Sequence, residues 1–211
     1  MKMNFYVDEN VLIPRQDTEI LVEEVMKRAN SESRVLDMCT GSGCIIISLA
    51  APGHTSENGA VAIDISDDAL KVADYNKKYN NADYIKLIKS DMFSSSECEQ
   101  YKNEDNRFDV IVSNPPYIPT KDIDELSEEV RLHDPVLALD GDTDGLKFYK
   151  AITKQSVNYL KENGYLCYEI GYNQAEDVRN IMEQCGYSGI KVIKDLAGLD
   201  RVVIGRLNNI N

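Results

Sequence analysis

The sequence predicts an α/β fold, in which an open, Rossmann-like sheet of seven mostly parallel strands carries helices on both faces. Three observations support this prediction. Short β-rich segments alternate with helical segments along most of the chain. The first two strands end in carboxylates, at the edge where ligands of such sheets bind. The last two strands are joined only by the short segment 194–200, so we expect them to form an antiparallel hairpin at one edge.

Runs rich in β-branched and aromatic residues predict the strands. The run at 108–113 is apolar on both faces, as a central parallel strand should be. The expected strands are 34–37, 60–64, 85–89, 108–113, 164–170, 190–193 and 201–206.

Four segments between these strands have apolar residues at helical spacing. Ser66 is suited to begin one of these helices, because its hydroxyl can accept a hydrogen bond from a free backbone N–H. Gly186 is suited to end the last of them. The expected helices are 44–51, 66–79, 146–160 and 174–185.

Length and composition predict one domain at 1–211, with an N-terminal segment and helix at 1–30 and a doubly wound core at 31–211. The longest apolar run, 44–51, is far shorter than the roughly 20 residues of a membrane span, and the first residues do not resemble a secretory signal. The five cysteines contain no C-x-x-C pair, and neither of the two histidines has ligand spacing to a cysteine. We therefore expect a cytoplasmic protein with no membrane partner and no metal site.

The formal net charge is −13. Phosphate groups would be repelled by such a chain, whereas proteins that bind bare nucleic acid usually present a basic face. No direct nucleic-acid partner is therefore expected.

A glycine-containing loop follows the first strand and precedes a helix, which is the context in which such loops bind ligands. Its glycines let the backbone approach a ligand without a Cβ clash. Tight strand–helix turns also need glycines, so the loop alone leaves a purely structural role open. The candidate cofactor contacts here are Asp37, Cys39, Thr40, Gly41, Ser42 and Gly43.

Carboxylates after the next two strands strengthen the case for a cofactor. Asp64 ends the second strand, and its carboxylate can accept hydrogen bonds from both ribose hydroxyls of an adenosyl group. Beyond the third strand, Asp91 can accept from the adenine amino group. Met92 can pack on the adenine ring, although simple core filling explains this methionine equally well. An NAD site is disfavoured because the loop is not G-x-G-x-x-G.

The tetrapeptide Asn114-Pro115-Pro116-Tyr117 ends the fourth strand and is the most specific motif of the chain. The two prolines stop the strand and keep Asn114 extended, because a residue before proline avoids the α region. The Asn114 amide is therefore expected to project towards the cofactor.

This motif suits the methylation of a planar NH₂ group, which is a poor nucleophile because its lone pair is delocalised. The side-chain oxygen of Asn114 and the Pro115 carbonyl can accept its two hydrogens and aim the lone pair at a methyl-sulfonium group. Orientation of this kind contributes on the order of 7–11 kcal/mol. Tyr117 offers a flat wall for stacking. The possible targets are adenine, guanine, cytosine and glutamine.

Beyond the tetrapeptide, the chain resembles the release-factor glutamine methyltransferases, the HemK/PrmC family, over nearly its whole length. The segment 11–19, Val-Leu-Ile-Pro-Arg-Gln-Asp-Thr-Glu, is the discriminating piece, because general amino methyltransferases do not carry it. The other matching segments are 5–7, 134–139, 144–146, 169–171 with Gln174, and Asp195 with Gly198, Asp200 and Arg201.

The resemblance implies a class I S-adenosylmethionine-dependent methyltransferase that modifies N5 of the glutamine in the Gly-Gly-Gln motif of peptide chain release factors. It implies cofactor contacts from 39–43, Asp64, Met92 and Asn114, and substrate contacts from Asn114, Pro115, Pro116 and Tyr117. Asn114, Pro115 and Tyr117 are the candidate catalytic residues.

The resemblance also implies roles for residues outside these motifs. Arg15 and Thr18 are expected to close the cofactor pocket. The alternative is that this segment only begins a helix, with Asp17 or Thr18 as its N-cap. Asp134 is expected to flank the substrate mouth.

The chain departs from the family pattern at three places. Cys39 stands where glycine is usual, so the backbone there must accept a Cβ, and Asp140-Gly141 replaces a usual glycine pair. The family normally carries a helical N-terminal domain that grips the release factor, and this sequence begins almost at the matching segment. We therefore expect either a truncated or a short form, with chemistry intact and protein-substrate affinity reduced.

Two other functions remain open at the level of sequence. An N-methyltransferase for an exocyclic amino group of a nucleic-acid base, adenine N6 or guanine N2, shares the tetrapeptide, but the acidic charge disfavours it. A non-catalytic adenosyl-binding module is disfavoured by the presence of both Asn114 and Asp64.

Overall fold

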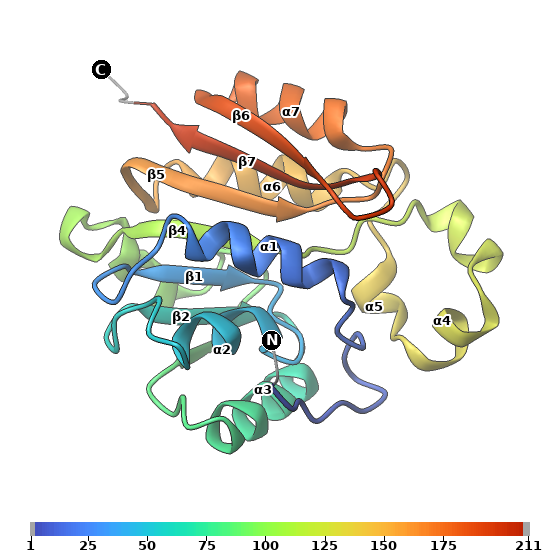
Figure 1. Cartoon of the computed structure of the whole chain (residues 1–211), viewed down its shortest axis with the longest axis horizontal. Helices are drawn as coiled ribbons and strands as arrows, with labels where there is room; N and C mark the ends of the chain where they lie inside the picture. The colour runs from blue at the N-terminus through green and yellow to red at the C-terminus, as the bar shows by residue number, and fades with distance from the viewer. Residues whose placement is uncertain (1–2, 209–211) are drawn as a thin grey trace.

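The computed structural model describes residues 3–208, and a seven-stranded sheet forms its centre (Figure 1). The strand order is β3-β2-β1-β4-β5-β7-β6, and the first five strands of that order are mutually parallel. The predicted fold class is confirmed. The strands are β1 (Val35–Met38), β2 (Ala60–Asp64), β3 (Lys86–Lys89), β4 (Phe108–Ser113), β5 (Leu160–Glu169), β6 (Tyr187–Lys194) and β7 (Asp200–Leu207).

The predicted C-terminal hairpin is present, and its second strand is inserted into the sheet. β7 pairs antiparallel with both β5 and β6, so β6 is the edge strand. Four consecutive residues of β7, 202–205, are buried, whereas β6 alternates between more and less exposed positions. A strand that is apolar on both faces requires cover on both, which explains why β7 occupies the interior position.

Helices cover both faces of the sheet (Figure 1). α1 (Asp17–Met26) and α2 (Cys44–Ala50) pack on one face, and α6 (Lys147–Ser156) and α7 (Ala175–Gln184) pack on the other. α3 (Asp67–Tyr79) lies beside α2 at the β2–β3 end of the sheet. No helix within residues 3–208 is long and apolar enough to cross a membrane.

The long connection from β4 to α6 lies beyond the carboxyl ends of the central strands (Figure 1). It contains α4 (Glu128–His133), α5 (Val136–Leu139) and the 3₁₀ helix Thr120–Glu125. Two further 3₁₀ helices, Ser96–Lys102 and Glu104–Asn106, precede β4. Since β1 leads to β2 on one side and β4 leads to β5 on the other, the chain reverses direction across the sheet between β1 and β4. Ligands of open α/β sheets bind at this point.

Two predicted helix ends are confirmed. Ser66 precedes α3, and its hydroxyl accepts a hydrogen bond from the Ala69 N–H at 3.2 Å. Gly186 follows α7 with a φ of 89°, a left-handed conformation that glycine adopts without strain.

The predicted helix 146–160 is too long, and its last residue belongs to a strand. α6 ends at Ser156, and Leu160 begins β5 by pairing with Phe108. The register then shifts before Tyr165 pairs with Val110, and Asn163, with a φ of 65°, lies in this irregular stretch. Leu160 is buried in the same cluster as Phe108, so its apolar character serves the sheet rather than a further helical turn. The other strand predictions differ from the structure by a few residues at their ends.

The interpretation of Asp17 or Thr18 as an N-cap is wrong. α1 begins at Asp17, and Gln16, the residue before it, makes no side-chain cap. Thr18 is buried, and its hydroxyl donates to Glu169 Oε2, at the end of β5, at 2.7 Å.

Candidate active site

The loop after β1 turns back on itself through left-handed residues. Cys39, Gly41 and Gly43 have φ values of 60°, 54° and 79°. The Thr40 N–H donates to the Ile63 carbonyl at 3.0 Å and thereby ties the loop to β2. Cys39 adopts a conformation that favours glycine, so the backbone does accept a Cβ at this departure from the family pattern.

Asp37 supports the loop from below. Its Oδ2 accepts from the Thr40 hydroxyl at 2.6 Å and from the Ile46 N–H at 3.3 Å. The side chain is fully buried, and Oδ1 has no hydrogen-bond partner within residues 3–208. Burial raises the pKa of this carboxyl to about 7. Asp37 is not part of the wall of the cavity described below, and a direct cofactor contact from this residue stays a prediction.

The fold requires glycine at Gly41 and at Gly43 for different structural reasons. A Cβ at Gly43 would lie 3.0 Å from Ile47 Cδ1 and 3.3 Å from Ala73 Cβ, so this glycine lets α2 and α3 approach each other. A Cβ at Gly41 would meet nothing within 4 Å. Gly41 therefore faces open space. Gly43 is a packing residue outside the wall of the cavity described below, and a cofactor contact from Gly43 stays a prediction.

Asp64 closes the loop from the end of β2. Its Oδ2 accepts from the Gly41 N–H at 2.9 Å, and its Oδ1 accepts from the Ser66 N–H at 2.9 Å. Burial raises the pKa of Asp64, although hydrogen bonds from Ser66 and Gly41 oppose that shift. Both carboxylate oxygens keep lone pairs that can accept from a ligand.

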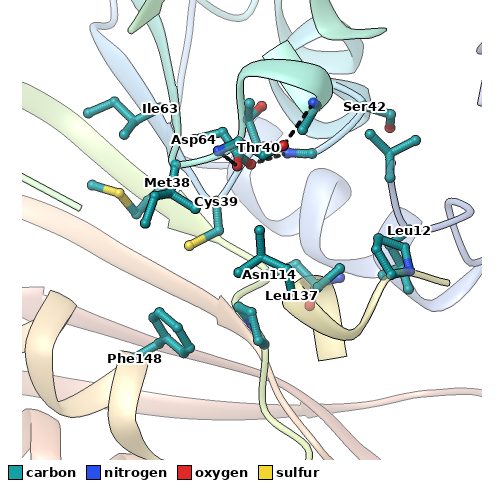
Figure 2. Close-up of a pocket in the computed structure, with 18 of the residues that line it drawn as sticks. Leu12, Met38, Cys39, Thr40, Ser42, Ile63, Asp64, Asn114, Leu137 and Phe148 are labelled. Carbon is teal, nitrogen blue, oxygen red and sulfur yellow. Dashed lines mark hydrogen bonds between the residues drawn. The ribbon is translucent and has the colours of Figure 1, made fainter. Parts of the chain in front are cut away.

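A cavity of about 430 Å³ opens between this loop and the β4–α6 connection, with Asp64 and Thr40 on one side and Leu137 and Phe148 on the other (Figure 2). Its wall is mainly apolar, with polar groups concentrated at the loop and the ends of β2 and β3. The sequence-predicted residues that line it are Cys39, Thr40, Gly41, Ser42, Asp64, Asp91, Met92, Asn114 and Pro116.

These residues suit an adenosyl cofactor. Gly41 leaves room where a Cβ would project, Asp64 presents acceptors for a diol, and Met92 and Phe148 offer apolar surface to a flat ring. The volume also lies within the usual range of small-molecule sites. Two residues that the sequence motifs did not predict are Ile65 and Phe148, because neither belongs to a recognisable pattern.

The N-terminal segment crosses the mouth of this cavity before α1 begins. It is fastened to α3, because the Asn76 amide accepts from the Tyr6 N–H at 2.7 Å and donates to the Tyr6 carbonyl at 2.9 Å. Leu12 and Pro14 then reach the cavity wall, followed by Thr18. The N-terminal segment, including Thr18, therefore forms part of the cavity wall, and its closure over a cofactor stays a prediction.

The tetrapeptide begins where β4 ends, beside β1. The Ser113 hydroxyl donates to the Met38 carbonyl at 2.6 Å, which fixes the end of β4 against β1. Asn114 follows and lies in the centre of the site near Cys39 (Figure 2). Pro116 lines the first cavity, and Tyr117 lines a second one. Pro115 is in the wall of neither, although its carbonyl role remains a prediction.

The second cavity, of about 230 Å³, lies on the other side of Asn114. Asn114 lines both cavities, as do Leu12 and Ala138. Tyr117 forms part of the wall, and burial raises the pKa of its hydroxyl to about 12, so the ring stays neutral. The remaining wall residues are Arg15, Asp17, Ile118, Leu126, Val130, Leu139, Glu169 and Arg201.

The connection to α6 packs closely against the Tyr117 backbone, and glycine makes this close approach possible. A Cβ at Gly141 would lie 2.8 Å from Tyr117 Cα, and the Gln174 amide donates to the Tyr117 carbonyl at 2.9 Å. Asp140, the departure from the usual glycine pair, makes a separate turn in which its Oδ1 accepts from the Thr120 hydroxyl at 2.7 Å. The chain therefore keeps glycine at the position of this pair that approaches Tyr117.

Arg15 and Asp134 form an ion pair with each other. The Arg15 guanidinium meets Asp134 Oδ2 at 2.7 Å, and the Ile13 N–H donates to Asp134 Oδ1 at 3.2 Å. The Asp134 side chain is 1% exposed, so it joins the N-terminal segment to the end of α4 instead of flanking an opening. Arg15 lines the second cavity and not the expected cofactor cavity.

Glu169 and Arg201 are charged residues in the wall of the second cavity that the sequence motifs did not assign to the site. Glu169 is buried at the end of β5, and burial raises its pKa to about 7. Arg201 contacts Asp17 at 3.3 Å and Asp195 at 3.1 Å. Both residues belong to segments that match the family pattern, and this match was the sequence signal that could have assigned them to the site.

A family described as "Methyltransferase domain" matches residues 29–200. A release factor glutamine methyltransferase of Clostridium acetobutylicum is 41% identical to this chain, over 97% of this chain and 70% of that protein. A release factor glutamine methyltransferase of Thermodesulfovibrio yellowstonii is also 41% identical, over 94% of this chain and 69% of that protein.

Solved structures agree with this assignment of fold. A release factor-specific protein-(glutamine-N5) methyltransferase of Alicyclobacillus acidocaldarius is 26% identical, with a TM-score of 0.53, and the match covers 97% of this chain and 100% of that one. A methyltransferase of Pyrococcus furiosus shares the fold with a TM-score of 0.67 at 15% identity, covering 98% of this chain and 90% of that one.

Proposed function

The chain belongs to the release factor glutamine methyltransferase family, and we propose that it methylates the side-chain amide nitrogen, N5, of a glutamine in a peptide chain release factor. The methyl donor is S-adenosylmethionine, and the target is the glutamine of the Gly-Gly-Gln motif. The names of the relatives support the acceptor class, and the tetrapeptide supports the chemistry.

The first cavity is the site we assign to S-adenosylmethionine, which supplies a methyl group on a positively charged sulfur. Asp64 accepts from the ribose hydroxyls, and Asp91 accepts from the adenine amino group. Met92 and Phe148 cover the adenine ring. The loop residues 39–42 approach the remainder of the cofactor through their backbone, which the open space beside Gly41 permits.

The second cavity is the site we assign to the glutamine side chain. Leu126 and Val130 line its outer part, and Tyr117 provides a flat surface against the amide plane. Asn114 Oδ1 and the Pro115 carbonyl accept the two hydrogens of the target NH₂. The nitrogen lone pair is then directed into the first cavity.

These acceptors also stabilise the reaction as it proceeds. The target nitrogen would gain positive charge as its bond to the methyl carbon forms, while the sulfur–methyl bond breaks and its electron pair stays on the sulfur. Nearby carbonyl oxygens would stabilise the charge on the nitrogen. The alkylated nitrogen is acidic enough to release its proton to water. No side chain is required to act as a strong base.

The single observation that carries this proposal is the position of Asn114 in the wall of both cavities. A residue that lines both sites can contact the methyl donor and the acceptor at once. In-line methyl transfer requires the acceptor nitrogen to approach the methyl group directly, and a residue where the two cavities meet can orient the acceptor for that approach.

The test is peptide mass spectrometry on a purified bacterial release factor after incubation with this chain and S-adenosylmethionine. The expected product carries one added methyl group on the Gly-Gly-Gln glutamine, and Asn114→Ala is the matched control. Retained cofactor binding without this product would contradict the proposal. A methyl group on adenine or guanine of added RNA or DNA would instead support the nucleobase alternative, with steep loss of binding in salt as its companion observation.

A further inference from the structure

The mechanism above leaves one buried carboxylate beside Asn114 without a role. Glu169 is 2% exposed and lies at the end of β5, in the wall of the second cavity. Its Oε2 accepts from the Thr18 hydroxyl at 2.7 Å, and its backbone carbonyl accepts from the Tyr149 hydroxyl at 2.9 Å. Asn114 follows Ser113, which pairs with Tyr168, so Asn114 and Glu169 lie beside each other where the neighbouring strands β4 and β5 end, and both line the second cavity. The Asn114 side chain also lowers the pKa of this carboxylate and so stabilises its charged form.

The chemistry of the two groups fixes the orientation of the Asn114 amide. An ionised carboxylate only accepts hydrogen bonds, and the amide donates only through its NH₂ group. An Asn114 amide that bonds to Glu169 must therefore turn its nitrogen towards that carboxylate, which leaves its oxygen free for another donor. The proposed reaction needs that orientation, because the target NH₂ group requires an acceptor.

The charges around Glu169 act in opposite directions. Burial raises its pKa most strongly, and Asp17 raises it further. The Thr18 hydroxyl, the Arg201 guanidinium and the Asn114 amide lower it. The Tyr117 and Tyr149 hydroxyls face the same region, and the pKa of each is raised by burial, so both stay neutral here. Arg15 lines the same cavity, where Asp134 neutralises it.

We propose that Glu169 is a positioning residue, which accepts from the Asn114 amide and so presents the Asn114 oxygen to the acceptor nitrogen. Through its second bond, to Thr18, it also couples the start of α1 to the tetrapeptide. Only the expected effect of Glu169 on the rate of methylation rests on the function proposed above. The hydrogen bond itself is testable without any acceptor.

The first experiment compares Glu169→Gln with wild type in turnover of a release factor. A glutamine at this position has one acceptor oxygen for two donors, so its NH₂ group faces either Thr18 or Asn114. Part of the Asn114 population then turns its oxygen away from the cavity. We expect kcat to fall by at least about tenfold while the Kd for S-adenosylmethionine stays within about threefold. Glu162→Gln, an exposed position on the same strand, is the matched control.

The second experiment observes the Asn114 side-chain amide by NMR in the protein without acceptor, with Asn114→Ala to assign its signals. In wild type these signals are expected to shift with a midpoint near the Glu169 pKa of about 7. Thr18→Val removes a bond that lowers this pKa, so the midpoint should move to higher pH. Glu169→Gln should abolish the titration, even though Asp37 remains, with a pKa also near 7.

The two experiments separate the positioning role from the proposed function. If wild type fails to methylate the release factor but the Asn114 signals titrate as described, the proposed function fails and the positioning bond stands. An Asn114 amide that does not respond to pH or to Glu169→Gln would overturn the positioning role. So would a Glu169→Gln enzyme with kcat within twofold of wild type. If Glu169→Gln does not fold, the Thr18→Val shift alone decides the outcome.

Discussion

Asn114 is the residue on which both cavities depend. Its extended backbone follows from Pro115, and its place beside Cys39 follows from the pairing of β4 with β1 (Figure 2). The first cause is local to the tetrapeptide, which is why a short motif identifies this residue, whereas the second comes from the pairing of two distant strands.

Asn114→Ala is expected to lower kcat by roughly 10²–10³, because it removes one hydrogen-bonding group that acts in the transition state. Single-turnover kinetics with a release factor would measure this, alongside calorimetric binding of S-adenosylmethionine to confirm an intact cofactor site. A variant within threefold of wild type would refute the role of this amide.

Asp64→Asn is expected to raise the Kd for S-adenosylmethionine by about tenfold or more, since one acceptor for the ribose hydroxyls becomes a donor. Isothermal titration calorimetry measures the change. Asp68→Asn is the matched control, because Asp68 lies on α3 outside the cavity wall and pairs with Lys71 on the surface. Equal affinities of the two variants would exclude Asp64 from the cofactor site.

At the scale of elements, the loop between β1 and α2 combines two requirements in five residues. Its left-handed turns bring the backbone to the cavity, and its end lets α2 pack against α3. Gly41 serves the first requirement and Gly43 serves the second.

The two glycines should therefore respond differently to alanine. Gly43→Ala adds a Cβ close to Ile47 and Ala73 on top of its unfavourable φ, and should lower the free energy of unfolding by about 2–3 kcal/mol. Gly41→Ala should cost only about 1–2 kcal/mol from φ, while weakening cofactor binding more than Gly43→Ala does. Urea unfolding and calorimetry on both variants measure the difference. The reverse order in either property would contradict the assignment.

For the molecule as a whole, two buried carboxyls make stability depend on pH. The pKa of Asp37 and that of Glu169 are raised from ordinary values of 3.8 and 4.5 to about 7, in each case mainly by burial. At pH values between the ordinary and the raised pKa of each group, the folded protein holds a proton that the unfolded chain has already released. The contribution of both groups to stability is therefore full at acidic pH and decreases as the pH rises to about 7.

The free energy of unfolding is accordingly expected to fall by a few kcal/mol between about pH 4 and pH 7. Urea unfolding at a series of pH values measures this slope. Asp37→Asn should flatten it and should be more stable than wild type at the alkaline end, because asparagine keeps an oxygen for Thr40 and carries no buried charge. A slope identical to that of wild type would show that Asp37 does not titrate in this range.

The order of elements and the two motifs of the site were determined by the sequence itself. Strand 108–113 ends in the tetrapeptide, and the loop at 37–43 lies between a strand and a helix, so each motif carries its own backbone conformation. Propensity, proline and glycine act over a few residues, and the alternation of strands and helices is a local pattern. This is why the fold class could be predicted, and why most of the predicted cofactor residues line the first cavity.

Only the tertiary structure decided which distant residues meet. It inserted β7 between β5 and β6, placed Asp37 beneath the loop, and ended α6 before Leu160 because that side chain packs with Phe108. Thr18 and Glu169 are 151 positions apart, yet their side chains are hydrogen-bonded beside Asn114. No local pattern encodes such a distance, because it follows from the pairing of whole strands and the packing of α1 on the sheet.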